Sequence, residues 1–331
     1  MRRVALPTTL TPEAARPRGG RDVSLRGPTM GVAWTLRARV PAGIADAAVA
    51  DAVQAACDLV VAEMSTWEPA SDLCRFNRAP AGQWSPAGRH LLAVLRAAIA
   101  VANQSGGAFD PTVAALVDLW GFGPPGGVDR PPGAAAIDAA RSAGWRGLRL
   151  DEDCGRLFQP GGVALDLSGI AKGYGVDLAA QALRRLGVRD FLIEIGGELR
   201  GEGVKGDGEP WWVEIERPPG ATLAEESVLV ALHGLSIASS GDWRRSFAAD
   251  GRVYSHTVDP RTGAPVDGAI AAVTVIHPDC MMADAYCTAL LVLGDGAEAF
   301  AGGHDVAALI TRRSGEGLSE HVSPALARML D

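Results

Sequence analysis

The sequence predicts an α+β protein, with mixed or antiparallel sheets, packed helices and two intimately associated subdomains. Strands outnumber helices in the second half of the chain, and several of them follow one another with no helix between. That order differs from the regular βαβ alternation of parallel sheets. Hydrophobic residues make up 47% of the 331 residues and charged residues only 21%, so the chain can bury a sizeable core.

The first elements follow from local patterns. Residues 1–21 are rich in arginine and proline with little periodicity and predict a flexible tail, which leaves 22–331 as a single domain. Alternation predicts a strand over 32–40, and apolar residues recur at helical spacing over 44–64. Ser85-Pro86 has the pattern of a helix N-cap followed by proline at the first helical position, so a helix is expected to begin there.

The second half predicts two further helices and several strands. A helix is expected over 173–186, where Gly187 stops it, and another over 281–293, which contains neither glycine nor proline. Buried or alternating apolar runs predict strands at 191–195, 211–216, 228–232, 252–258, 271–276 and 306–311.

Composition narrows the class of protein. The net charge of −8 disfavours a nucleic-acid partner, whose phosphates require a basic face. Five cysteines without CxxC spacing fit neither a disulfide framework nor a zinc site and indicate a reducing compartment. The sequence contains no run of 18 apolar residues, so no membrane span is predicted, and its N-terminus makes a poor secretory signal. The expected location is the cytoplasm.

Two segments carry the most chemical information. Asp284 and Thr288 are four residues apart on the helix expected over 281–293, so they share a face. A carboxylate and a hydroxyl are hard oxygen ligands that suit Mg²⁺ held together with substrate phosphates. Such a pair is common on helices. Here, however, alanines flank Asp284, and burying its charge without a partner would be costly.

The second segment runs from Asp166 to Gly173. It supplies an aspartate, a glycine with an accessible carbonyl at Gly169, and Lys172, whose compact charge serves phosphate well. Together the two segments predict a metal-assisted phosphate site.

Further segments, in this order and spacing, resemble the ApbE family of FAD:protein FMN transferases over about 22–313. They are Met30-Gly31, Met64–Pro69 with Ser71–Asn77, Gly107–Thr112 with Leu119–Gly123, Asp166–Asp177, Glu194–Gly197, Ser239–Asp242 with Ser255–Gly263, and Ala283–Thr288.

The resemblance implies a Mg²⁺-dependent enzyme that splits FAD, moves the FMN half onto a Thr or Ser hydroxyl of an acceptor protein, and releases AMP. It implies Mg²⁺ ligands at Gly169, Asp284, Cys287 and Thr288, the glycine and cysteine through their carbonyls. It implies an FAD site lined by Met30, Trp67, Ala108, Phe109, Asp110, Asp166, Lys172 and Val258. His256 matches the family's candidate catalytic histidine.

Other interpretations remain open at this point. A Mg²⁺-dependent FAD pyrophosphatase would use water in place of the protein hydroxyl, and a non-catalytic flavin-binding protein would not turn FAD over. Asp166, Asp259 or the metal itself could take the proton in place of His256. Arg261 could contact phosphate or pair with an acid. Trp67 could stack on a flavin or adenine ring or pack ordinarily.

Overall fold

The computed structural model describes residues 3–141, 144–218, 227–242, 246–249, 251–315 and 317–330. Its centre is an eight-stranded sheet in the order β18-β17-β16-β11-β8-β7-β3-β2. Each pair of neighbours in this sheet is antiparallel. The strands are β2 (Arg21–Thr29), β3 (Val32–Val40), β7 (Asp190–Ile195), β8 (Glu198–Glu202), β11 (Leu235–Gly241), β16 (Ile270–His277), β17 (Ala307–Ser314) and β18 (Gly317–Val322).

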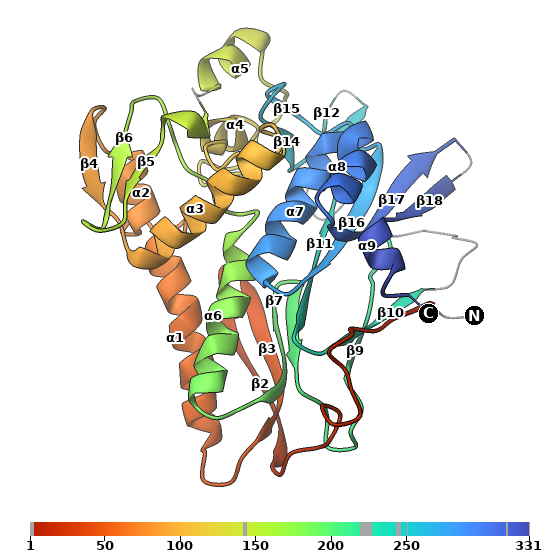
Figure 1. Ribbon diagram of the computed structural model, residues 1–331. Coiled ribbons are helices and arrows are strands. Elements are labelled where there is room, and N and C mark those ends of the chain that lie inside the picture. The colour runs from red at the N-terminus through yellow and green to blue at the C-terminus, as the bar shows by residue number, and fades with distance from the viewer. Residues whose placement is uncertain are drawn as a thin grey trace.

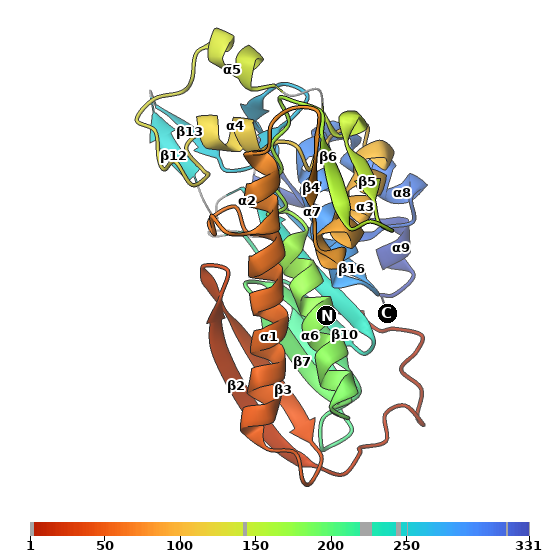
Figure 2. The ribbon, with the colours of Figure 1, turned by 90° about the vertical axis from the view of Figure 1, so that its left-hand side faces the viewer.

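Three long helices cover one face of this sheet (Figure 1). They are α1 (Asp46–Met64), α6 (Ala171–Arg185) and α7 (Cys280–Leu293). Helix α6 packs between the other two, as the view turned by 90° also shows for α1 and α6 (Figure 2). Helix α3 (Arg89–Gln104) packs against α1 and α7, and α8 (Ala297–Gly303) packs against α7 and β17. The prediction of an α+β fold is confirmed.

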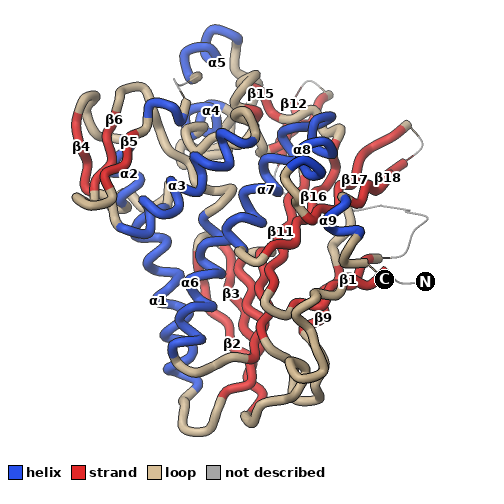
Figure 3. Tube along the Cα trace, viewed as in Figure 1, coloured by secondary structure: helices blue, strands red, loops and turns tan. Residues whose placement is uncertain are grey.

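Smaller elements surround the central sheet and the helices that cover it (Figure 3). One three-stranded sheet has the order β4-β6-β5, another has the order β1-β10-β9, and two hairpins pair β12 with β13 and β14 with β15. The strands are β1 (Arg3–Ala5), β4 (Gln83–Pro86), β5 (Arg149–Asp151), β6 (Arg156–Gln159), β9 (Trp211–Glu214), β10 (Val228–Leu232), β12 (Ser246–Ala249), β13 (Arg252–Ser255), β14 (Val258–Asp259) and β15 (Ala264–Pro265). The short helices are α2 (Asp72–Asn77), α4 (Ala114–Leu119), α5 (Ala134–Ala140), α9 (Pro324–Ala327) and the 3₁₀ turns η1 (Trp145–Gly147) and η2 (Gly294–Gly296).

The N-terminal segment differs from the expected flexible tail. Strand β1 pairs in parallel with β10, Ala5 is fully buried, and the Leu6 N–H donates to the Met329 carbonyl over 2.9 Å. Met1 and Arg2 lie outside the described residues. Residues 3–6 at the start of the expected tail are therefore held by backbone pairing, which composition does not reveal.

Two local predictions also change. Ser85-Pro86 ends strand β4, and α3 begins at Arg89 after Gly88. The Glu63 carboxylate of α1 accepts the Leu91 N–H over 2.7 Å, so a residue distant in the sequence caps the first turn of α3. The strand expected over 252–258 splits into β13 and β14, and His256 lies between them.

Helix α7 is the most buried of the long helices. Cys280–Gly303, which includes α7, η2 and α8, is long and apolar enough to cross a membrane by length and composition alone. In that window 61% is buried inside the protein, as in a core helix. The apolar face of α7 therefore packs against β11 and β16, and this packing fixes the helix that carries Asp284 and Thr288.

Candidate functional site

A cavity of about 370 Å³ brings together segments that are far apart in the sequence. Its walls come from the loops after α1, α3 and β13, the turn between β7 and β8, strand β11, the start of α6 and one face of α7. The predicted site residues that line it are Trp67, Ala108, Phe109, Asp110, Asp166, Gly169, Lys172, His256, Val258, Asp284 and Thr288. Eleven of the thirteen predicted residues therefore meet in one place.

The start of α6 approaches α7 closely at two glycines. A Cβ atom at Gly169 would lie 2.7 Å from Thr288 Oγ1, and one at Gly173 would lie 2.3 Å from the Cys280 carbonyl oxygen. The Gly173 N–H donates to Asp284 Oδ2 over 3.0 Å. These contacts require glycine, and they hold the carboxylate and the hydroxyl of α7 beside the backbone that precedes α6.

Lys172 and Asp284 form the charged centre of this wall. Lys172 Nζ lies 2.6 Å from Glu198 Oε1, and the Lys172 side chain is 30% exposed to solvent. Burial alone would lower the pKa of Lys172, but the charges of Asp284 and Glu198 outweigh burial and raise it to about 12. Burial raises the pKa of Asp284, while Lys172 and the Gly173 N–H oppose that rise. Lys172 is therefore a fixed positive charge at neutral pH.

A second wall is the loop after α3. Gly106 and Gly107 adopt positive φ angles of 61° and 87°, and a Cβ at Gly107 would lie 2.7 Å from the Trp145 ring. This glycine turn directs Ala108, Phe109 and Asp110 into the cavity. Asp110 Oδ1 accepts the N–H of Thr112 over 2.8 Å, and burial raises the Asp110 pKa against the effect of that bond.

Two further predicted residues, Trp67 and Asp166, also line the cavity. Trp67 is 60% exposed although it is a large apolar side chain, and it lines the cavity. Asp166 accepts the Ser168 N–H at Oδ1 over 2.7 Å, and its own N–H binds the Pro111 carbonyl over 2.9 Å. An exposed indole beside a cavity can stack on a planar ring, so ordinary core packing does not describe Trp67.

His256 reaches the cavity from the segment between β13 and β14. Its ring lies 6.3 Å from the Phe122 ring, edge to face. Val258, which follows in β14, lines the same wall. Arg261 donates to Asp259 over 2.8 Å and to the Val292 carbonyl over 2.9 Å, so it pairs with an acid and ties this segment to α7.

Two predicted residues do not line the cavity. Met30 sits in the β2–β3 turn with a positive φ of 47°, and its side chain packs toward Gly175 of α6. Cys287 is fully buried, and its thiol donates to the Ala238 carbonyl over 3.2 Å. Neither side chain is among those that line the cavity, and the ligand role of the Cys287 carbonyl stays a prediction.

The structure also adds residues to the site that were not among the predicted site residues. Glu198 follows the Gly196-Gly197 turn and is the partner of Lys172, and Val32, Ser239 and Ser240 line the cavity. The position of Glu198 directly after a glycine pair is the sequence feature that could have marked it as a site residue. Its pairing with Lys172 depends on β8 lying beside α6, which no local pattern reveals.

The lining has an excess of negative charge. Among the described residues that line the cavity, the carboxylates are Asp110, Asp166, Glu198 and Asp284, against Lys172 alone among lysines and arginines. A phosphate-bearing ligand would meet net repulsion there, because like charges at short range disfavour one another. A bound cation would remove that repulsion.

Comparisons with known proteins agree with this geometry. The model of the ApbE family matches residues 30–310. An FAD:protein FMN transferase of Vibrio cholerae is 34% identical over 322 residues, covering 93% of each chain. One of Klebsiella pneumoniae is 34% identical over 315 residues, covering 92% of this chain and 89% of that protein.

Solved structures give the same result. The apo form of the flavinyl transferase ApbE of Pseudomonas stutzeri superposes with a TM-score of 0.86 at 38% identity, covering 93% of this chain and 96% of that one. The flavin transferase ApbE of Vibrio cholerae gives 0.85 at 32% identity, covering 94% and 100%. The chain therefore belongs to the ApbE family and is a flavin transferase.

Proposed function

We propose that the protein transfers the FMN half of FAD to a Thr or Ser hydroxyl of an acceptor protein, with Mg²⁺ bound and AMP released. The observation that carries this proposal is the wall where Gly169, Lys172, Asp284 and Thr288 meet, in the same cavity as His256. It supplies oxygen donors, a phosphate-binding cation and a base within one site. The names of the relatives support FAD as donor and a protein as acceptor.

The donors suit Mg²⁺ rather than a softer metal. Asp284 offers a carboxylate, Thr288 a hydroxyl and Gly169 a carbonyl, all hard oxygen ligands. The described residues contain no group of three His, Cys, Asp or Glu side chains placed to hold a metal. Mg²⁺ fits such a sparse set because it commonly takes one or two carboxylates and completes its shell with water and substrate phosphates. When bound, it polarises a phosphoryl oxygen and neutralises charge on the leaving group.

The side chains divide the remaining work. Lys172 has three N–H donors, of which Glu198 engages one, so the ammonium can also donate to a phosphate oxygen. Asp110 and the glycine turn before it shape the wall against the dinucleotide. Trp67 offers its exposed ring for stacking on an aromatic ring of FAD.

The transfer exchanges one P–O bond for another. The acceptor oxygen attacks the FMN phosphorus, the bond between that phosphorus and the bridging oxygen breaks, and the bridging oxygen leaves with AMP. His256 takes the proton from the acceptor hydroxyl, as a neutral imidazole can near neutral pH. Positioning and electrostatic stabilisation supply most of the catalysis in phosphoryl transfer of this kind.

Mass spectrometry of candidate acceptors co-expressed with the protein tests this proposal. We expect an added FMN phosphoester on a Thr or Ser, and its absence from cells that carry the Asp284→Ala variant. The purified protein is also incubated with FAD and Mg²⁺ without acceptor. Rapid AMP release there would identify an FAD pyrophosphatase, and FAD that stays bound and intact even with acceptor would identify a non-catalytic flavin-binding protein.

A further inference from the structure

Helix α6 and the residues just before it meet α7 through three pairs of positions, each pair four residues from the next. The pairs are Gly169 with Thr288, Gly173 with Asp284, and Asp177 with Cys280. Since the numbering rises on one side as it falls on the other, the helices are antiparallel, and each pair lies one helical turn from the next. Gly169, Thr288 and Asp284 line the cavity, and the third pair lies one turn of α7 beyond Asp284.

The third pair is an unusual helix cap. Asp177 Oδ1 accepts the Cys280 N–H over 3.1 Å, and Oδ2 accepts the Met281 N–H over 2.9 Å. These are the first two N–H groups of α7, which have no partner within the helix. Asp279, at the N-cap position of α7, makes no side-chain capping bond. A carboxylate of α6 therefore does the work of the cap.

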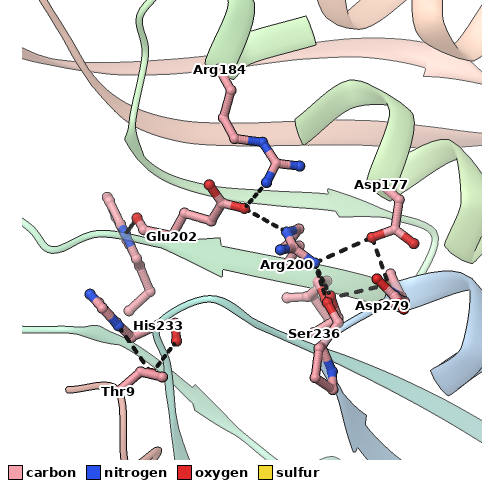
Figure 4. Close-up of polar contacts among 12 residues, drawn as sticks. Thr9, Asp177, Arg184, Arg200, Glu202, His233, Ser236 and Asp279 are labelled. Carbon is pink, nitrogen blue, oxygen red and sulfur yellow. Dashed lines mark hydrogen bonds and ion pairs between the residues drawn. The ribbon is translucent and has the colours of Figure 1, made fainter. Parts of the chain in front are cut away.

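Arg200 of β8 fixes this carboxylate from the other side (Figure 4). One guanidinium nitrogen lies 3.4 Å from Asp177 Oδ1, donates to Ser236 over 3.2 Å and binds the carbonyl of Pro278. The Nε atom donates to Glu202 over 2.8 Å. The chain that enters α7 is thus held by residues of α6, β8 and β11.

We propose that Asp177 is a positioning residue that sets the register of α7 against α6 and so places Asp284 and Thr288 for the metal. This proposal rests on the metal-binding role proposed above. The same four-residue spacing that aligns Asp177 with Cys280 aligns Gly173 with Asp284, so a slip at the cap moves the carboxylate in the cavity.

Ionised Asp177 is energetically unfavourable in its buried surroundings, which supports a functional reason for a carboxylate at this position. Burial raises the pKa of Asp177 to about 6, although the N–H groups of Met281 and Cys280 and the charge of Arg200 oppose the rise. The charge of Asp279 adds to it. Asp177 is therefore ionised at neutral pH in surroundings that do not favour its charge, and the ionised form is the one with two acceptor oxygens for α7.

The test compares Asp177→Asn, Asp177→Glu and the matched control Asp279→Asn. The Asn variant places an amide N–H₂ against one N–H of α7, whereas the control removes a carboxylate at the same helix end without removing a cap. FMN transfer is measured against Mg²⁺ concentration, and thermal unfolding is measured alongside. We expect Asp177→Asn to raise the half-maximal Mg²⁺ concentration about tenfold or more and also to slow transfer, since a displacement of about 1 Å can cost on the order of 10²-fold in rate.

Asp177→Glu keeps the charge one methylene further out and is expected to restore part of the Mg²⁺ response, and Asp279→Asn is expected to match wild type. Asp177→Asn that unfolds at lower temperature but keeps the wild-type Mg²⁺ response and rate would overturn the proposal. If the Asn variant does not fold, a folded Asp177→Glu with an unchanged Mg²⁺ response overturns it equally.

The Asp284→Ala variant separates this proposal from the metal-binding role on which it rests. If wild-type transfer does not depend on Mg²⁺, or Asp284→Ala is fully active, the proposed metal role fails and the positioning proposal falls with it. If Asp284→Ala is inactive while Asp177→Asn responds to Mg²⁺ as wild type does, only the positioning proposal fails.

Discussion

Gly173→Ala is the sharpest test of the contact between α6 and α7. The added Cβ would lie 2.3 Å from the Cys280 carbonyl oxygen and 2.9 Å from Asp284 Cβ, where ordinary contacts begin at 3.4 Å. The obstacle is largely backbone, so the helices must separate by about 1 Å for the methyl group to fit. The Gly173 N–H, which donates to Asp284 over 3.0 Å, moves with them.

The magnitude follows from two opposing effects on stability and one on rate. Overpacking costs about 1–3 kcal/mol, while replacing glycine by alanine inside a helix returns about 1 kcal/mol. The net loss is therefore about 0–2 kcal/mol, and the protein should still fold. The rate of FMN transfer should fall on the order of 10²-fold, the effect of a displacement of about 1 Å at a catalytic group.

Gly175→Ala is the matched control in the same helix. Its Cβ would meet the end of Met30 at 3.1 Å and of Ile195 at 3.3 Å, which are flexible side chains that can shift, and Val60 at an ordinary 3.8 Å. Gly175→Ala gains the same helix propensity as Gly173→Ala and should keep the wild-type rate of FMN transfer. The assay is FMN transfer to an acceptor, followed by flavin fluorescence of the protein band, together with thermal unfolding. A Gly173→Ala variant as fast as Gly175→Ala would refute the reasoning.

Four further outcomes are expected. Asp284→Ala should abolish transfer, whereas Asp284→Asn should retain FAD binding with most of the rate lost, as equilibrium dialysis and kinetics at varied Mg²⁺ will show. Lys172→Met should weaken FAD more than riboflavin, which lacks phosphate; equal losses in titration would make Lys172 a packing residue. His256→Ala should slow transfer by about 10²–10⁴-fold with little change in FAD affinity, and an unchanged rate would pass the base role to Asp166 or Asp259. Because the folded protein binds the Asp177 proton more tightly than the unfolded chain, ionisation of Asp177 opposes folding as pH rises from 3.8 to about 6. Urea unfolding should therefore show wild type losing stability relative to Asp177→Asn over that interval, and a constant difference would contradict the pKa.

Much of the fold was predictable because local patterns coincide with the final elements. The alternation over 32–40 is β3, and the helix expected over 281–293 is α7 with one more residue at its start. Where an element depends on a distant partner, the sequence misled. Ser85-Pro86 has the local signature of a helix start, yet the helix begins where the Glu63 carboxylate of α1 can reach its first turn.

The site was predictable to the extent that each segment carries its own signal. Asp284 and Thr288 share a helix face by spacing alone, and the glycine turn before Asp110 marks a close approach of backbone. Glu198 was missed because its role depends on β8 lying against α6. Met30 packs toward Gly175 of α6 and is not among the residues that line the cavity, so its contact with FAD stays a prediction.

The two ends of the α6–α7 contact are built from the same parts but balanced differently. At the closed end, two main-chain N–H groups and Arg200 give both oxygens of Asp177 a partner, although burial still raises its pKa. At the open end, Asp284 meets one N–H and shares Lys172 with Glu198, so negative charge remains in excess. A buried charge without full compensation is costly, and folding tolerates it only where something else completes the balance. That imbalance at the cavity, rather than any single ligand, is the strongest physical support for the proposal that a cation and phosphates bind there together.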